Sequence, residues 1–124
     1  MSVTVDFVGV SARKINGEIK AILLDTEFIG ESRSAREGIE PLVEDKLVVR
    51  LDSDEINVDE NIRQYLVLDK HAFLSAIEAD LTILDPDYRR FEGLTSYTEG
   101  HETIIEMMTK YQDDPHVQWY FHIT

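Results

Sequence analysis

Three histidines near the C-terminus, His101, His116 and His122, have side chains that could ligate a metal or transfer a proton. Arg89 and Arg90 form an adjacent arginine pair that could hold a phosphate or a carboxylate. A site assembled from such distant residues and nearby carboxylates requires no contiguous motif. The chain could therefore be a small enzyme or a small-ligand-binding domain, which is one alternative that the sequence leaves open.

The spacing of these histidines argues against a shared metal. In a β-strand, at about 3.3 Å per residue, His116 and His122 lie roughly 20 Å apart, whereas zinc ligands lie about 2 Å from the ion. The segment HETII begins like the zinc-protease motif H-E-x-x-H, but Ile105 stands where the second histidine is required. We expect Ile105 in the core and His101 at the surface, in the first turn of a helix.

Other signatures of catalysis or cofactor binding are incomplete or missing. On an EF-hand loop over residues 52–63, Asp52 and Asp54 fit, but Arg63 replaces the bidentate glutamate. The acids beside Arg89 and Arg90 favour local ion pairs over a bound anion. The chain contains no cysteine, which excludes disulfides and thiolate chemistry, and no G-x-S-x-G, G-x-G-x-x-G or P-loop motif. We predict no metal, no cofactor and no enzymatic activity.

Acidity is the strongest feature of the composition. The chain has 25 Asp and Glu residues against 12 Lys and Arg, a formal net charge of −13. Nucleic acids and anionic membranes are bound through clustered cations, so neither is an expected partner. A strong negative field raises the rate of encounter with a basic protein. The alternative is that the charge only maintains solubility.

The acids concentrate between two predicted strands. KLVVRLD and RQYLVLD are β-type runs, and the segment SDEINVDEN connects them. If the two strands pair, the acids of the connection gather at one end of the sheet. We predict that this negative patch contacts the partner through Asp52, Asp54, Glu55, Asp59 and Glu60.

The C-terminal stretch HVQWYFHIT predicts a half-buried strand. Alternation places Val117, Trp119, Phe121 and Ile123 on an apolar face. The opposite face carries His116, Gln118, Tyr120 and His122. Because tyrosine is favoured at protein interfaces, this polar face is a second candidate for the partner-binding surface.

Local signals place the remaining elements. Asn16-Gly17 between two β-type runs predicts a long hairpin, and a change of apolar phase at Gly9 predicts a bulge or a sharp coil of the strand. The segment GESRSAREGIEP is typical of a loop with at most one helical turn before Pro41. Helical periodicity begins after Asp69, an expected N-cap, and recurs over residues 98–112.

This order of elements predicts one α+β domain over residues 1–124. The expected architecture is a largely antiparallel sheet that starts with a long β-hairpin, two helices packed on one face, and a C-terminal strand. The N-terminus has no pattern of a signal peptide, and no apolar run approaches the roughly 20 residues that cross a bilayer. We expect a cytoplasmic protein.

This profile resembles that of the bacterial immunity proteins, which protect a cell from its own toxin, including those of contact-dependent growth inhibition. The resemblance covers the whole chain and is carried by the acidic charge, the segment SDEINVDEN and the lack of catalytic motifs. It implies an inhibitor that covers the active-site region of a basic toxin, often a nuclease, with acidic side chains. An acidic mimic of DNA is a further alternative, and the oligomeric state stays open.

Overall fold

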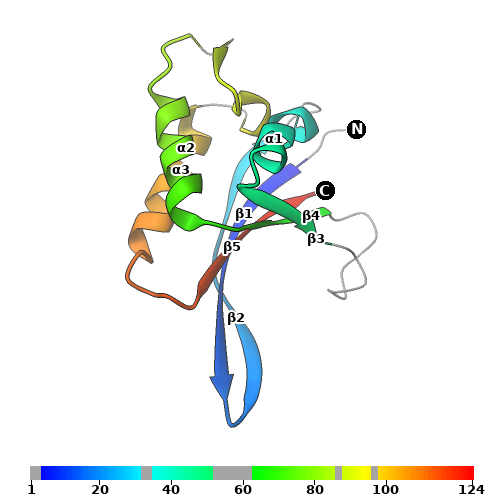
Figure 1. The fold of residues 1–124 in the computed structure, drawn as a ribbon, viewed down its shortest axis with the longest axis vertical. Helices are drawn as coiled ribbons and strands as arrows, with labels where there is room; N and C mark the ends of the chain where they lie inside the picture. The colour runs from blue at the N-terminus through cyan, green and yellow to red at the C-terminus, as the bar shows by residue number, and fades with distance from the viewer. Residues whose placement is uncertain (1–3, 32–34, 52–62, 86–87, 96–97) are drawn as a thin grey trace.

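A long hairpin opens the fold, because Asn16 and Gly17 both adopt positive φ angles, 53° and 83°, as a type I′ turn requires. The turn joins β1 (Thr4–Ile15) to β2 (Glu18–Glu31). The structure is a computed structural model, and it describes residues 4–31, 35–51, 63–85, 88–95 and 98–124. The predicted hairpin is confirmed, and its far half extends well beyond the rest of the molecule (Figure 1).

The sheet has five antiparallel strands in the order β2-β1-β5-β4-β3. The remaining strands are β3 (Val48–Leu51), β4 (Arg63–Val67) and β5 (Val117–Ile123). The predicted pairing of β3 with β4 is confirmed. The C-terminal strand β5 lies at the centre of the sheet between β1 and β4, so the residues of both its faces have neighbours on either side.

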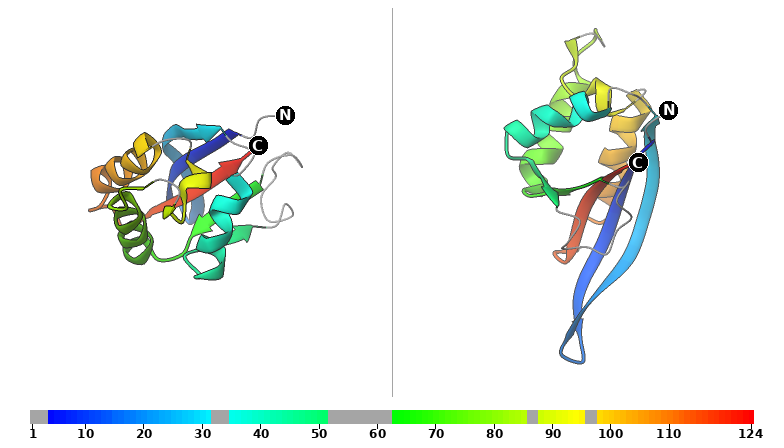
Figure 2. Two further views of the ribbon diagram at one scale, coloured as in Figure 1. Left: turned by 90° about the horizontal axis from the view of Figure 1, so that it is seen from above. Right: turned by 90° about the vertical axis from the view of Figure 1, so that its right-hand side faces the viewer.

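The helices lie on one side of this sheet (Figure 2). They are α1 (Ala35–Glu44), α2 (Lys70–Leu81) and α3 (Thr98–Lys110), with a short 3₁₀ turn η2 (Glu92–Leu94). The predicted cap of α2 is confirmed, because the Ala72 N–H donates to the Asp69 carboxylate over 3.1 Å. The α+β class follows, with helix α1 in addition to the two that periodicity predicts.

Helix α1 corrects the expectation of a loop before Pro41. Pro41 lies inside the helix, although proline removes one backbone hydrogen bond there. Tertiary packing offsets that loss, because Ile39 and Leu42 are buried in the core. A Cβ added to Gly38 would come within 2.1 Å of the Leu94 backbone nitrogen, so glycine lets α1 and η2 approach closely.

The core between helices and sheet is built on stacked aromatic rings. Phe7 of β1 lies 5.1 Å from Trp119 of β5, with the ring planes 2° apart, and 5.0 Å from Phe121. The predicted apolar face of β5 is confirmed, since Val117, Trp119, Phe121 and Ile123 are all buried.

The hairpin has a bulge at Gly9, as predicted, but the extra residue lies in β2 and the alternation of side chains along β1 is not interrupted. The register shifts between Gly9 and Val10, with Leu24 of β2 as the extra residue, while β1 pairs with β5 without interruption. The side-chain position of Gly9 is filled by Trp119, whose ring would lie 2.6 Å from an added Cβ. The apolar residues Val8 and Val10 therefore belong to the face of the sheet opposite the helices.

Candidate interaction surface

The face of the sheet opposite the helices, which we call the open face, carries continuous rows of paired residues across all five strands. The first row is Thr26, Val8, Tyr120, Leu66 and Val49. The second row is Phe28, Asp6, His122, Gln64 and Leu51. The open face therefore combines apolar and aromatic side chains with polar ones, a composition typical of protein-binding surfaces.

The hairpin adds exposed apolar side chains to the open face. Register places Ile19, Leu23 and Phe28 of β2 there, opposite Lys14, Val10 and Asp6. Their exposed fractions are 76% for Ile19, 61% for Leu23 and 57% for Phe28. Exposed apolar side chains that gather on one face make that face a candidate interaction site.

The predicted polar face of β5 is partly assembled into this surface. Gln118, Tyr120 and His122 lie on the open face, where the Tyr120 hydroxyl donates to Gln118 Oε1 over 2.9 Å. Burial raises the pKa of Tyr120, so its phenol stays protonated and able to donate. His116 precedes β5 and lines a separate hollow at the start of that strand. The acids Asp52, Asp54, Glu55, Asp59 and Glu60 fall outside the described residues.

His122 is held by a neighbouring amide on the open face. Its Nε2 lies 2.9 Å from the side-chain amide of Gln64. Desolvation by burial lowers the pKa of His122, and the nearby Asp6 carboxylate opposes this effect. The surface is therefore built around an uncharged histidine.

Acidification is expected to destabilise the fold through His122. Its folded pKa lies below the ordinary value of 6.5, so the unfolded chain takes up this proton first. The contribution of neutral His122 to the free energy of unfolding is thus complete above pH 6.5 and is lost as the pH falls below that value. The free energy of unfolding, measured in urea between about pH 5 and 7.5, should depend less on pH for His122→Gln than for the parent. An NMR titration midpoint at or above 6.5 for His122 would contradict the prediction.

His101 is not at the surface, which corrects the sequence expectation. It is 1% exposed, and its Nε2 lies 2.7 Å from Asp80 Oδ2 while its Nδ1 lies 2.9 Å from the Thr95 hydroxyl. Asp80 also accepts from the backbone N–H groups of Arg90 and Phe91, over 2.7 and 3.2 Å. This arrangement resembles a hydroxyl–histidine–carboxylate relay, but Thr95 is 1% exposed and meets no solvent. The network joins α2 and α3 to the segment between them.

A periodic signal could have located this network. Asp80 follows Phe73 and Ile77 at helical spacing, and His101 precedes Ile104 and Met108 in the same way. Both polar residues therefore continue a buried stripe. Polarity alone suggested exposure, whereas their position on the helix indicates burial.

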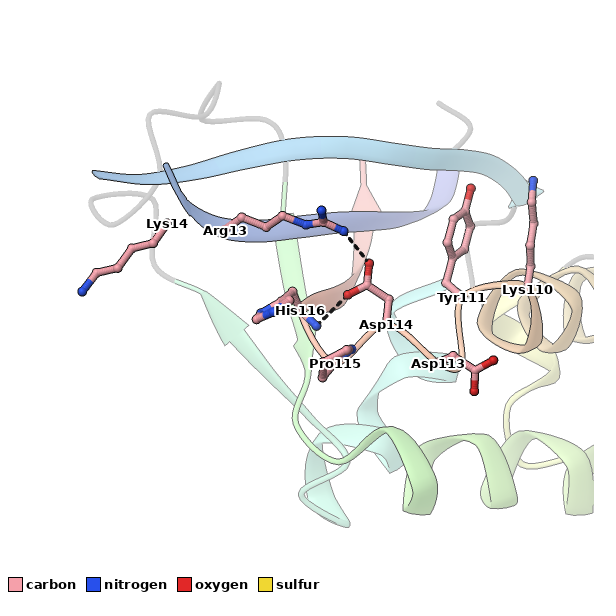
Figure 3. Close-up of a pocket in the computed structure, with 8 residues that line it drawn as sticks. All are labelled: Arg13, Lys14, Lys110, Tyr111, Asp113, Asp114, Pro115 and His116. Atoms are coloured by element: carbon pink, nitrogen blue, oxygen red, sulfur yellow. Dashed lines mark hydrogen bonds and ion pairs between the residues drawn. The ribbon is translucent and has the colours of Figure 1, made fainter. Parts of the chain in front are cut away.

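His116 contributes to a broad hollow of about 710 Å³ at the start of β5 (Figure 3). There Asp114 accepts from the His116 backbone N–H over 2.9 Å and pairs with Arg13 over 3.0 Å. The His116 hydrogen bond, supported by Arg13, lowers the pKa of Asp114. Lys14 points away from the hollow and Arg13 toward Asp114 (Figure 3). The basic groups thus do not converge on a common ligand position.

The structure does not bring the candidate catalytic residues together. His101 lies in the core, His116 at the hollow and His122 on the open face, bonded to Gln64. Arg90 pairs with the distant Asp45 at 2.7 Å, and Arg89 donates to the Ile83 carbonyl over 2.9 Å. Within the described ranges no group of three or more His, Asp or Glu side chains could hold a metal.

No family model, curated protein or solved structure matches this chain. In the part of the chain that the structure describes, none of the helices is long and apolar enough to cross a bilayer.

Proposed function

We propose that this chain is a cytoplasmic binding protein that neutralises a basic protein partner, as an immunity protein neutralises its toxin. The partner would be a toxin domain, such as a nuclease, whose active-site region is covered by acidic side chains. The proposal is carried by one observation: a strongly acidic chain exposes apolar side chains along one face of its sheet and hairpin.

The two features of this surface have different roles in binding. Exposed Leu23 and Phe28 supply apolar area whose burial stabilises a complex. The net charge of −13 attracts a basic partner over a longer range and raises the association rate, mostly at low salt. A partner that matches both features has a positive surface beside an apolar patch.

Affinity purification of the tagged chain from its source organism, followed by mass spectrometry, tests the class of partner. We expect a stoichiometric basic polypeptide at low salt that is partly released by a high-salt wash. If no polypeptide is captured at either salt concentration, the proposed function is wrong.

Reversing the acids of the connection between β3 and β4 is expected to slow association with that polypeptide. The variant combines Asp54→Lys, Glu55→Lys, Asp59→Lys and Glu60→Lys. Its association rate at low salt should fall at least about tenfold, because steering by opposite charge is lost. Stopped-flow or surface-based kinetics at several salt concentrations should also show a weaker salt dependence.

A control variant with the same change of net charge separates the patch from the overall field. Four exposed helical glutamates, Glu40, Glu44, Glu78 and Glu102, are changed to lysine instead. Equal slowing by the two variants would remove the acidic connection from the interface and leave only the net charge.

A further inference from the structure

Strand β2 forms an edge of the sheet, since among the described strands it pairs only with β1. The Thr4 N–H and carbonyl both bond to Thr124, each over 2.9 Å, so even-numbered residues of β1 direct their backbone groups toward β5. The backbone groups of odd-numbered residues such as Phe7 then point toward β2. On β2, the partners of the even-numbered residues direct their backbone groups outward, and these are Ile19, Ala21, Leu23, Thr26 and Phe28.

The same outward-directed residues place their side chains on the open face. All are exposed, and Ile19, Leu23 and Phe28 are large and apolar. Edge strands of soluble proteins are usually shortened, covered or protected by charge. The outer edge of β2 combines available hydrogen-bonding groups with apolar side chains, which is the composition of a template for strand addition.

The other face of β2 is acidic beside this edge. Asp25 and Glu27 of β2 line a groove of about 330 Å³ together with Glu106 and Lys110 of α3. Both β2 residues pair with helix-side positions of β1, Gly9 and Phe7. The groove therefore carries three carboxylates against one ammonium group on the helix side of the sheet.

From this geometry we propose that β2 is extended by a strand of the partner in which basic and apolar side chains alternate. The backbone of that strand pairs with the outward groups of Leu23, Thr26 and Phe28. Since successive side chains point to opposite faces, its Lys or Arg residues enter the acidic groove while its apolar residues pack on Leu23 and Phe28. The inference rests on the proposed function, because it specifies how the basic partner docks.

A second copy of this chain matches the edge less well. Each copy carries a formal charge of −13, and pairing of two β2 strands brings Asp25 and Glu27 of both chains to one interface. Like charges that meet across an interface are unfavourable. A basic strand instead compensates the carboxylates of the groove.

Thr26→Pro tests strand addition without changing any charge. Proline removes an N–H that points away from β1, and edge strands tolerate proline at such positions. The matched control is Thr26→Val, which keeps the N–H and the β-branched shape. Circular dichroism and thermal unfolding first establish that both variants fold. A third variant, Leu23→Lys with Phe28→Lys, independently tests the apolar contacts on the open face.

The probe is a ten-residue peptide of alternating lysine and valine, with a glutamate–valine peptide as the charge control. We expect the lysine peptide to slow exchange of the outward β2 amides and to bind Thr26→Pro at least tenfold more weakly than Thr26→Val. The double lysine variant should bind it at least tenfold more weakly than the parent. The glutamate peptide should leave the β2 amides unchanged. The inference would be overturned if the lysine peptide did not protect the β2 amides from exchange, if the two peptides bound equally, or if the chain formed concentration-dependent dimers joined through β2.

The natural partner distinguishes failure of the inference from failure of the proposed function. If a basic polypeptide co-purifies equally with the parent and Thr26→Pro, the function stands and strand addition at β2 is wrong. If the parent captures no polypeptide, the function is wrong, and the peptide experiment alone decides whether the edge accepts a basic strand.

Discussion

Replacing Asp80 with alanine is expected to lower the free energy of unfolding by about 3 to 5 kcal/mol, the usual loss when one partner of a buried polar pair is removed. Asp80 is 3% exposed and accepts from the Arg90 and Phe91 backbone as well as contacting His101. Its removal leaves these groups buried without their acceptor. Urea unfolding monitored by far-UV circular dichroism measures the loss directly.

Two further substitutions define the cause of that loss. Glu78→Ala, at an exposed position of the same helix, should change stability by no more than about 0.5 kcal/mol. Asp80→Asn keeps the shape and one acceptor oxygen and should therefore be less destabilising than alanine. A loss below about 1 kcal/mol for Asp80→Ala would show that the network does not hold α2 and α3 together.

The predictable parts of the fold are those with local causes. Asn16 and Gly17 specify the turn of the hairpin by backbone conformation alone, and Asp69 specifies the start of α2 by a side-chain hydrogen bond. Alternation in β5 identifies both of its faces. In each case the residues that determine the structure lie within a few positions of one another.

Helix α1 could not be predicted in this way, because its stability depends on distant contacts. Pro41 is locally unfavourable in a helix, and Gly38 lowers helix propensity. The burial of Ile39 and Leu42 and the close approach of Leu94 outweigh both effects. None of these contacts is visible before the chain is folded.

The candidate surface was predictable only in part for a similar reason. The sequence places Gln118, Tyr120 and His122 on one face of a strand, but it does not show which neighbours extend that face. The apolar residues Ile19 and Leu23 are typical of a core strand in sequence. Ile19 is exposed because the hairpin continues beyond the end of β5. Leu23 is exposed because it lies on the open face of the edge strand β2.

Truncation of the Trp119 side chain is expected to have the second large effect on the free energy of unfolding. It is 2% exposed and stacks on Phe7, and Trp119→Ala should lower the free energy of unfolding by about 3 to 5 kcal/mol. Gly9→Ala should cost about 1 to 3 kcal/mol, because the new methyl group would overlap the Trp119 ring and force the core apart. Thermal or urea unfolding of the single variants measures both losses.

Combining the two substitutions tests whether Gly9 is required by Trp119 or by the backbone of the hairpin. Without the indole ring, the methyl group added by Gly9→Ala enters the space that truncation creates, so this substitution should cost less than about 0.5 kcal/mol in the Trp119→Ala background. The resulting coupling would show that glycine is present at the register shift to admit the ring. If Gly9→Ala is equally costly in both backgrounds, the constraint lies instead in the bulged backbone, where the register of β2 changes between Asp25 and Leu23. Because the same register sets which residues of β2 face outward, that result would make Gly9 a determinant of the exposed edge as well as of the core.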